Sequence, residues 1–365
     1  MENLEKKGFK LSKELERMGI DSSVLEKYEK LINNIKFVNI NPDSESGKIH
    51  LKMIASLFSV EENNKTFLKN IIKNIELEDL VHVDISDYLS DDNVDNLDSL
   101  NAENIDLDIG LNRRVNKIDC YLNSGDKISF TLSTDLRNVK DEESNSAQEK
   151  LVFKSPIGKD NPILQKYLGY LERDFDGKNM RFIAKEYLPG KNIAHYINNL
   201  NNESESLFNI SDVSSDLAYS MAYLYKRGEA EILSDLKLEN VIYNYEKANE
   251  CEYPCRVCDN SGFYEGQAKR KSVFQILAHL QSLLSVFNNK KNQIIREKGS
   301  VEFDVEQEEI LDSYLDSFLD NLDKESLLIF KNNINEILLN QNDNDIFEID
   351  QELVEYVKSS SDLYN

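Results

Sequence analysis

The stretch EILSDLKLENVIYNYE, residues 231–246, places an acid, a cation and an amide within six residues of one another. These residues are Asp235, Lys237 and Asn240, and the apolar run 241–243 follows them directly. A short apolar run of this kind, after a polar loop, indicates a buried strand. In a chain rich in Asp, Asn and Lys this spacing is common by itself, so its meaning depends on the segments around it.

Four further segments lie in a consistent order around this loop. Residues 161–170 (NPILQKYLGY) predict a turn followed by a strand, and residues 181–190 (RFIAKEYLPG) predict an apolar strand that ends in a turn. Residues 211–228 then carry apolar side chains at helical spacing and lead into the loop. Downstream, residues 255–262 (CRVCDNSG) contain an acid, Asp259, next to a glycine-ended turn.

Together, these segments resemble the protein-kinase-like fold superfamily in a divergent form. The resemblance covers most of the chain after residue 100, and it implies an α+β fold in which a bilobal kinase-like domain follows a helical N-terminal region. Residues 181–190 would be the hinge between the lobes, whose backbone at Glu186 and Leu188 would bind adenine. The implied regions are a helical region with an acidic linker (1–100), a small lobe (101–186) and a helical large lobe (187–365).

The same resemblance implies a role for each polar residue of the loop. Asp235 would be the catalytic base that takes the proton of the attacking hydroxyl, and Lys237 would stabilise the charge on the transferring phosphate. Asn240 and Asp259 would hold Mg²⁺ on the phosphates of ATP, because both offer the oxygen ligands that this ion prefers. One short loop would then direct base, cation and metal ligand at a single phosphoryl group.

Two departures from the family pattern bear on control of the activity. Leu233 and Ser234 stand where the family has His-Arg, and that Arg grips a phosphate on the activation loop. Only residues 263–270 separate the Asp259 segment from the next amphipathic helix. The chain therefore resembles reduced bacterial effector-type kinases, or kinases of small molecules, and we expect no switching by activation-loop phosphorylation.

The small lobe has two possible registers. The preferred one predicts strands at residues 105–110, 115–122 and 127–132, with a tight turn at 123–126. It leaves Gly110 as the single glycine in the loop that would cover the phosphates.

In this register Thr131 takes the position of the phosphate-binding Lys, so another cation has to replace it. Lys117 or Lys127 would do so, as a neighbouring strand does in the with-no-lysine kinases, and Glu149 would be the ion-pair Glu of the small lobe. The alternative register makes Lys154 the phosphate Lys and Glu172 its partner. It leaves 13 residues between Glu172 and the hinge, too few for the two strands normally found there.

Composition bounds the function. The net charge is −24, with 43 basic and 67 acidic residues, so the chain lacks the basic surplus that binding to a nucleic-acid backbone requires. No apolar run approaches the roughly 20 residues that span a bilayer. We expect a cytoplasmic protein, or one secreted into a host cytosol, with no nucleic-acid partner and no transmembrane segment.

Three of the four cysteines cluster as Cys251, Cys255 and Cys258. This spacing also occurs in the iron–sulfur motif of radical S-adenosylmethionine enzymes, but only 107 of the 365 residues follow it, too few for most of a barrel. We favour ordinary thiols over a zinc or iron–sulfur site. His279 lies in an apolar helical pattern and is expected to be a hydrogen-bonded core residue.

The remaining segments are expected to be mainly helical. Residues 11–37 and 49–75 have apolar residues at helical spacing, and the Asp- and Asn-rich residues 90–108 suit a linker. Residues 303–359 would be the closing helices of the large lobe, with a frayed tail at 359–365.

These observations favour an ATP- and Mg²⁺-dependent phosphotransferase that acts on a hydroxyl of a protein, small molecule or lipid. One alternative is a pseudokinase-type interaction protein that binds a protein partner through its N-terminal helical region. Another is a kinase-like enzyme with different nucleotide chemistry, such as adenylyl transfer.

Overall fold

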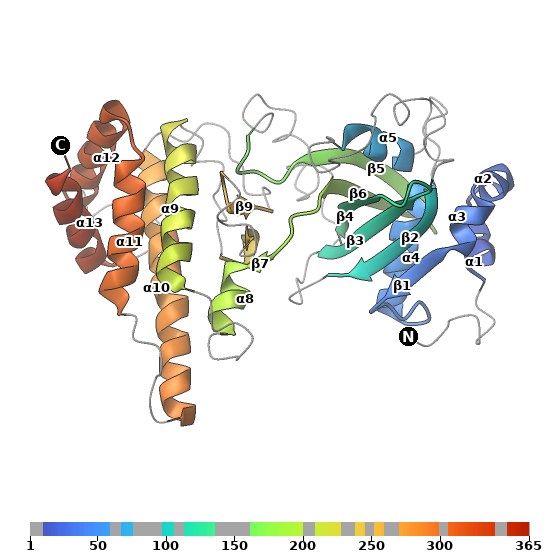
Figure 1. Ribbon diagram of the computed structural model, residues 1–365, viewed down its shortest axis with the longest axis horizontal. Coiled ribbons are helices and arrows are strands. Elements are labelled where there is room, and N and C mark those ends of the chain that lie inside the picture. Colours follow the sequence, from blue (N-terminus) through green and yellow to red (C-terminus); the bar gives the residue numbers. More distant parts are fainter. Residues whose placement is uncertain are drawn as a thin grey trace. The chain divides into compact units, whose positions relative to one another are not determined.

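The computed structural model contains two compact units (Figure 1). Unit 1 comprises residues 1–150 and 166–187, and unit 2 comprises residues 151–165 and 188–365. The structure describes residues 10–58, 67–75, 97–105, 113–135, 161–199, 209–227, 238–244, 252–258, 270–298, 306–339 and 349–364.

Unit 1 is built on a six-stranded sheet with the strand order β1-β2-β3-β4-β6-β5. Its strands are β1 (Ile35–Val38), β2 (Leu97–Asn104), β3 (Arg113–Leu122), β4 (Lys127–Asp135), β5 (Tyr167–Phe175) and β6 (Lys178–Glu186). Its helices are α1 (Leu11–Arg17), α2 (Ser22–Lys27), α3 (Glu29–Asn33), α4 (Glu45–Leu57) and α5 (Phe67–Asn74). Only the β1–β2 pair is parallel; the other pairs are antiparallel.

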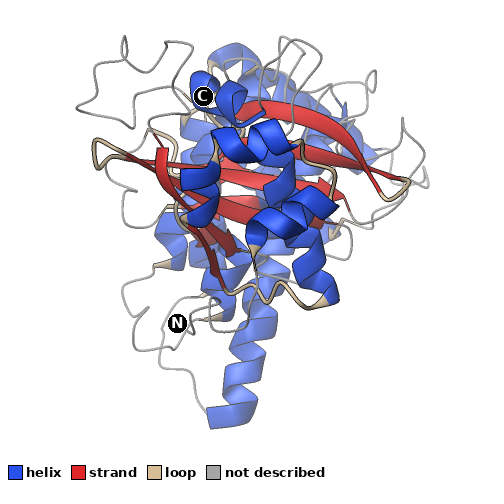
Figure 2. Cartoon of the chain, turned by 90° about the vertical axis from the view of Figure 1, so that its right-hand side faces the viewer, coloured by secondary structure: helices blue, strands red, loops and turns tan. Residues whose placement is uncertain are grey.

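The two faces of this sheet differ in chemistry because side chains alternate along each strand. One face is apolar: Ile118 on β3, Phe130 on β4 and Phe182 on β6 are fully buried in one core with side chains of α4 and α5. Figure 2 shows helices lying over the strands of this unit. The opposite face carries Lys117, Thr131 and other polar side chains.

The sequence predicts a separate helical region at the N-terminus, but the structure does not contain one. The N-terminal helices pack on the same sheet as the strands predicted for the small lobe. Two strands were also missed. β1 overlaps the end of the stretch 11–37 predicted as helix, and β2 lies in the Asp- and Asn-rich stretch predicted as linker. Leu97, Leu100 and Ala102 of β2 are buried in the core, so tertiary packing overrides a local sequence with weak strand preference.

The predicted strands after this point are found. β3 and β4 form a hairpin closed by the turn at 123–126, and β5 and β6 form a second hairpin that runs into the predicted hinge. The first strand of the preferred register is predicted at 105–110, and residues 106–110 lie outside the described residues; the described strand that pairs with the outer side of β3 is β2.

Unit 2 combines helices with a small sheet of order β7-β8-β9. Its elements are β7 (Lys191–Asn192), α8 (Ile193–Asn198), α9 (Ile210–Lys226), η6 (Leu238–Asn240), β8 (Val241–Tyr243), β9 (Cys255–Val257), α10 (Arg270–Lys298), α11 (Gln307–Asp320), α12 (Lys324–Leu339) and α13 (Gln351–Leu363). The α+β class predicted from the sequence is therefore confirmed.

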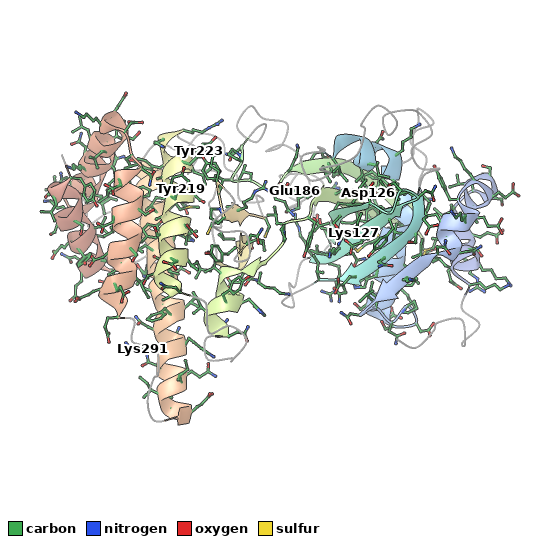
Figure 3. The ribbon with its side chains drawn as sticks, in the orientation of Figure 1. Asp126, Lys127, Glu186, Tyr219, Tyr223 and Lys291 are labelled. Atoms are coloured by element: carbon green, nitrogen blue, oxygen red, sulfur yellow. The ribbon has the colours of Figure 1, made fainter. Side chains whose placement is uncertain are left out.

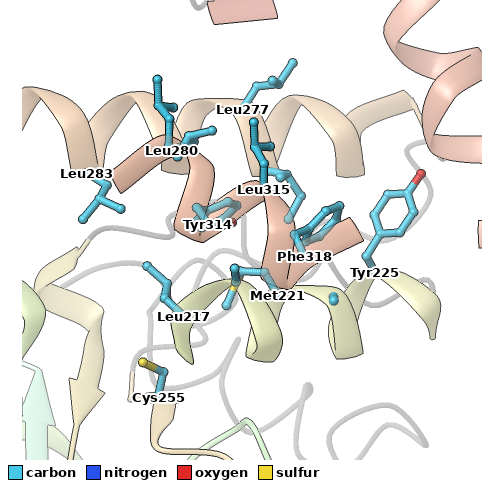
Figure 4. Packing of buried hydrophobic residues seen from close by; sticks show 14 of the residues in the cluster. Leu217, Met221, Tyr225, Cys255, Leu277, Leu280, Leu283, Tyr314, Leu315 and Phe318 are labelled. Carbon is cyan, nitrogen blue, oxygen red and sulfur yellow. The ribbon is translucent and has the colours of Figure 1, made fainter. Parts of the chain in front are cut away.

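The core of unit 2 lies where α9, α10 and α11 meet. Figure 4 shows Leu217 and Met221 of α9 facing Tyr314 and Phe318 of α11. The apolar face predicted for α10 is confirmed, since all seven of its residues are buried: Val273, Ile276, Leu277, Leu280, Leu283, Leu284 and Phe287.

The C-terminal segment differs from the frayed tail that was expected. Helix α13 continues to Leu363, and the Tyr364 hydroxyl donates a hydrogen bond to the Asp316 carboxylate at 2.7 Å. Aromatic anchoring of the last described residue was not visible in the polar sequence of this tail.

Gly190 lets the chain after the hinge approach β8. Its φ is +114°, and a Cβ added there would lie 2.1 Å from the carbonyl oxygen of Tyr243. β7 begins at the next residue, Lys191, which pairs with Tyr243, so the clash would fall on the first rung of this sheet.

We therefore expect Gly190→Ala to lower the free energy of unfolding by about 3 kcal/mol or more, measured by denaturant titration. Gly177→Ala is the matched control. Gly177 also has a positive φ, +76°, but nothing lies within 4 Å of an added Cβ, so only the backbone strain of about 1–2 kcal/mol is expected. Equal losses in the two variants would show that contact with Tyr243 is not what requires glycine.

Candidate functional site

Three residues form a row across the polar face of the unit 1 sheet. Lys117 on β3 pairs with Thr131 on β4, and Thr131 pairs with Lys185 on β6. Residues paired directly across antiparallel strands project from the same face. Thr131, the residue at the expected position of the phosphate-binding Lys, is therefore flanked by a lysine on each side.

The two lysines that were expected to replace the missing one share an acidic neighbour. The carboxylate of Asp119 lies 3.4 Å from the Lys117 ammonium and 4.0 Å from the Lys127 ammonium, and it also accepts a hydrogen bond from Ser129 at 2.6 Å. Lys117 additionally lies over the ring of Tyr187, 4.5 Å from its centroid, which links β3 to the hinge. Lys127 begins β4 beside the hairpin turn and is 47% exposed (Figure 3).

The start of the predicted hinge is held by hydrogen bonds to Thr131 of β4 and to Lys166, the residue before β5. The Thr131 hydroxyl donates to the carbonyl of Lys185 at 3.3 Å and reaches that of Glu186 at 3.5 Å. The Glu186 carboxylate accepts from the backbone N–H of Lys166 at 2.5 Å, and its own N–H donates to the Lys166 carbonyl. Glu186 ends β6 (Figure 3), and both its side chain and its backbone N–H fix the strand end, so the backbone carbonyl is the part of Glu186 that is a candidate for adenine.

The position of Glu172 contradicts the alternative register. That register made Glu172 the partner of Lys154, whereas Glu172 lies on β5 and accepts a hydrogen bond from Arg181 on β6 at 3.1 Å. The two strands before the hinge are β5 and β6 themselves, as the preferred register requires. The hydrogen bond from Tyr170 is the main cause that lowers the pKa of the Glu172 carboxyl. Arg181 lowers this pKa further, and burial opposes both effects.

In unit 2, strand pairing brings the end of the 231–246 stretch next to the segment that precedes Asp259. β8 and β9 pair antiparallel from Val241 with Val257, and the backbone N–H of Cys258 donates to the Asn240 carbonyl at 2.8 Å. Asn240 ends the short helical turn η6, just before β8. Asp259 follows Cys258 in the chain but lies outside the described residues.

β8 is fixed from both sides, which positions Asn240. The Tyr243 hydroxyl donates to Asp216 of α9 at 3.0 Å, and burial raises the pKa of this Asp216 carboxyl. On the other side of β9, the backbone of Gln165 donates to the Val257 carbonyl at 2.9 Å. Neither support could be recognised from the sequence, because both partners are far from Asn240 along the chain.

Several predicted site residues lie outside the described part of the structure. They are Asp235, Lys237, Asp259, Glu149 and Gly110, together with Lys154 of the alternative register. Leu188 is described and belongs to unit 2, where its side chain is buried.

The cysteine cluster does not offer a set of metal ligands among the described residues. The Cys255 thiol is buried in the core of unit 2 beside α9 (Figure 4), and burial raises its pKa, which keeps it in the neutral form. Cys251 is outside the described residues, and Cys258 is half-buried. Within the described residues there is also no group of three or more His, Cys, Asp or Glu placed to hold a metal ion.

His279 was expected to be a hydrogen-bonded core residue, and only its burial is confirmed. Within the described part of the chain, neither ring nitrogen has a hydrogen-bond partner. Burial lowers the pKa of this imidazole to about 3.

None of the described helices is both long and apolar enough to span a membrane.

Comparison with known proteins leaves the family open. No protein-family model and no curated protein matches the sequence. Among the matching solved structures is the apo structure of a pseudokinase, which is 13% identical, with 68% of this chain and 88% of that chain covered and a TM-score of 0.37. A likeness at this level supports no conclusion about activity. The α+β architecture, with two hairpins leading into a hinge segment, is consistent with the kinase-like fold that the sequence resembles.

Proposed function

We propose that this chain is an ATP-dependent phosphotransferase built on a kinase-like scaffold. The observation that carries the proposal is the hydrogen bond between Cys258 and Asn240, which sets the residue before Asp259 beside Asn240. An amide and a carboxylate offer the oxygen ligands that suit a hard ion such as Mg²⁺. The proposal requires the side chains of Asn240 and Asp259 to hold one metal on the phosphates.

The other roles follow from the loop before Asn240. Asp235 would act as base toward a hydroxyl of a protein, small-molecule or lipid acceptor, and Lys237 would stabilise the transferring phosphoryl group. The backbone of the proposed hinge, at Glu186 and Leu188, would bind adenine. Phosphoryl transfer depends mainly on positioning and electrostatics, so a cation from another strand can replace the strand Lys.

The second candidate is a pseudokinase-type interaction protein, and one observation favours it. Thr131 cannot supply a charge, and its hydroxyl is already used in bonds to the carbonyls of Lys185 and Glu186. If no other cation binds the phosphates in place of the missing lysine, the polar face of the unit 1 sheet has only a structural function.

Thermal unfolding with nucleotide separates the two candidates. We expect Mg²⁺–ATP to raise the melting temperature of the full chain, because a ligand at 100 times its Kd stabilises the folded state by about 2.7 kcal/mol. ATP with the metal chelated should give a smaller rise. Transfer of the γ-phosphoryl group to an acceptor or to water would then be followed with labelled ATP. An unchanged melting temperature at millimolar Mg²⁺–ATP would contradict the phosphotransferase and favour the interaction protein.

A further inference from the structure

Three helices of unit 2 border a groove of about 720 Å³. The groove lies between α10 and the N-terminal ends of α11 and α13, three helices that pack against one another (Figure 1). A volume in this range is typical of sites that hold a ligand or the side chains of a partner. All of the residues that line the groove belong to unit 2, so its shape does not depend on where unit 1 lies.

The groove combines an apolar base with an acidic rim. Leu284, Leu311 and Leu353 come from the three helices in turn and are almost fully buried, so they form its base. The ring of Tyr356 on α13 adds an aromatic wall. Four exposed carboxylates complete the lining: Glu306, Glu308, Asp350 and Glu352.

The chain neutralises little of this negative charge. Lys291 of α10 lies 3.1 Å from the Glu306 carboxylate (Figure 3 labels Lys291). Across the residues that the structure describes, no lysine or arginine forms an ion pair with Glu308, Asp350 or Glu352. The helix dipole favours an acid in the first turn of each helix. It does not require the acids of two helices to converge on one groove, where they repel one another.

The acidic surface continues from the groove along α11. Asp312 and Asp316 follow Glu308 at intervals of four residues, so the three acids share one face of the helix and lie about 6 Å apart along it. The Tyr356 hydroxyl donates to Asp312 at 2.5 Å. This bond, burial and the charges of Asp312, Glu308 and Asp316 raise the pKa of Tyr356 to about 12. The groove and the acidic face of α11 are therefore one continuous surface.

We propose that this surface is a docking site for a basic amphipathic helix of a partner protein. Apolar side chains of the partner helix enter the groove and cover its leucine base. Lysines or arginines spaced four residues apart on that helix lie against Glu308, Asp312 and Asp316, because both helices repeat at about 6 Å. The docking site goes beyond the proposed phosphotransferase and does not depend on it.

Charge complementarity favours this occupant over others. Residues 299–305 and 340–348 adjoin the rim along the chain, but both segments carry acids and neither has a lysine or arginine. A second copy of the chain would bring a net charge of −24 toward an equal charge. A small polycation would satisfy the carboxylates and leave the apolar base in water. A basic helix with one apolar face matches both parts of the surface.

The first test titrates the full chain with a synthetic amphipathic helix that has leucines on one face and lysines four residues apart beside them. A peptide of the same composition in scrambled order is its control. We expect the ordered peptide to bind at least about tenfold more tightly, because only its helix presents both faces together. Raising the salt from about 0.05 to about 0.3 M should weaken its binding, because salt screens exposed charges.

Two pairs of substitutions test the charge of the rim. Glu308→Gln with Glu352→Gln removes two carboxylates from the groove and should weaken binding of the ordered peptide about tenfold or more. Glu297→Gln with Glu325→Gln removes two exposed acids of α10 and α12 that do not line the groove. This second pair should bind as the unaltered chain does. Equal losses in the two pairs would show attraction to the overall negative charge and overturn the docking site.

A bulky side chain tests the groove itself without changing any charge. Ser285 is an exposed lining residue of α10, and Ser285→Phe should fill the groove and weaken peptide binding at least about tenfold. Asn292→Phe is the matched control, because Asn292 is exposed two turns further along α10 and does not line the groove. The melting temperature of each variant shows whether it is folded.

The remaining outcomes are decided by the unaltered chain. Equal affinity for the ordered and scrambled peptides overturns the proposal. So does tight binding of spermine that excludes the ordered peptide, which would indicate a site for a small cation. A dimer that Ser285→Phe dissociates would make a second copy the occupant and also overturn it. Peptide binding without any ATP binding leaves the docking site standing while the phosphotransferase fails, and the reverse result separates them in the other direction.

Discussion

Asp259→Ala is expected to lose most of the rise in melting temperature that Mg²⁺–ATP produces in the unaltered chain. Asp259 would be the charged member of the metal pair, and its loss leaves only the neutral amide of Asn240 to hold the ion. At an ATP concentration of 100 times the original Kd, a hundredfold loss of affinity reduces the stabilisation from about 2.7 to about 0.4 kcal/mol. Thermal unfolding with and without Mg²⁺–ATP measures this directly.

The matched control for this variant is Asp320→Ala. Asp320 is an exposed acid at the end of α11, so its removal changes the net charge equally without touching the proposed metal pair. It should keep the full shift, and Asn240→Ala should lose part of it. A full shift in Asp259→Ala would refute the metal assignment. A lower melting temperature of that variant without nucleotide would indicate a structural role instead.

Stability is expected to fall as the pH drops from about 6.5, and His279 should account for a large share of the fall. Burial lowers the pKa of this imidazole to about 3 in the folded chain, whereas an unfolded His titrates near 6.5. Between these values the unfolded chain binds one more proton, so each pH unit costs about 1.4 kcal/mol. At pH 5 the loss from this residue is about 2 kcal/mol, and below pH 3 the contribution is lost completely.

The direction of this pH dependence can be checked with His279→Leu, because leucine does not titrate and leaves no unpaired polar atom at this position in the core. We expect the free energy of unfolding of this variant, relative to the unaltered chain, to rise by about 2 kcal/mol between pH 7.5 and pH 5. His195→Leu, at a partly exposed histidine of α8, serves as the control. Denaturant titrations at the two pH values give the comparison. Parallel pH profiles for His279→Leu and the unaltered chain would show that His279 is not buried in neutral form.

Local patterns were sufficient for much of the fold. The hairpin of β3 and β4 follows from two alternating runs around Asn123–Asp126, and the buried face of α10 follows from its helical spacing. These elements can be predicted from the sequence because each one depends on residues that are close together along the chain. β2 could not be read in the same way, because its Asp- and Asn-rich sequence becomes a strand only through pairing with β1 and β3.

The candidate site shows the same division. The sequence by itself determined the chain order of the 231–246 loop, the strands around it and the residues proposed for phosphoryl transfer, since this order depends only on position along one chain. Only the tertiary structure decided that Glu172 is a strand residue, that Asn240 adjoins Cys258 and that Lys117 and Lys185 flank Thr131. Each of these facts follows from how strands pair with one another. Register is set by which faces are buried and by how the strands align, so it joins residues that lie far apart along the chain.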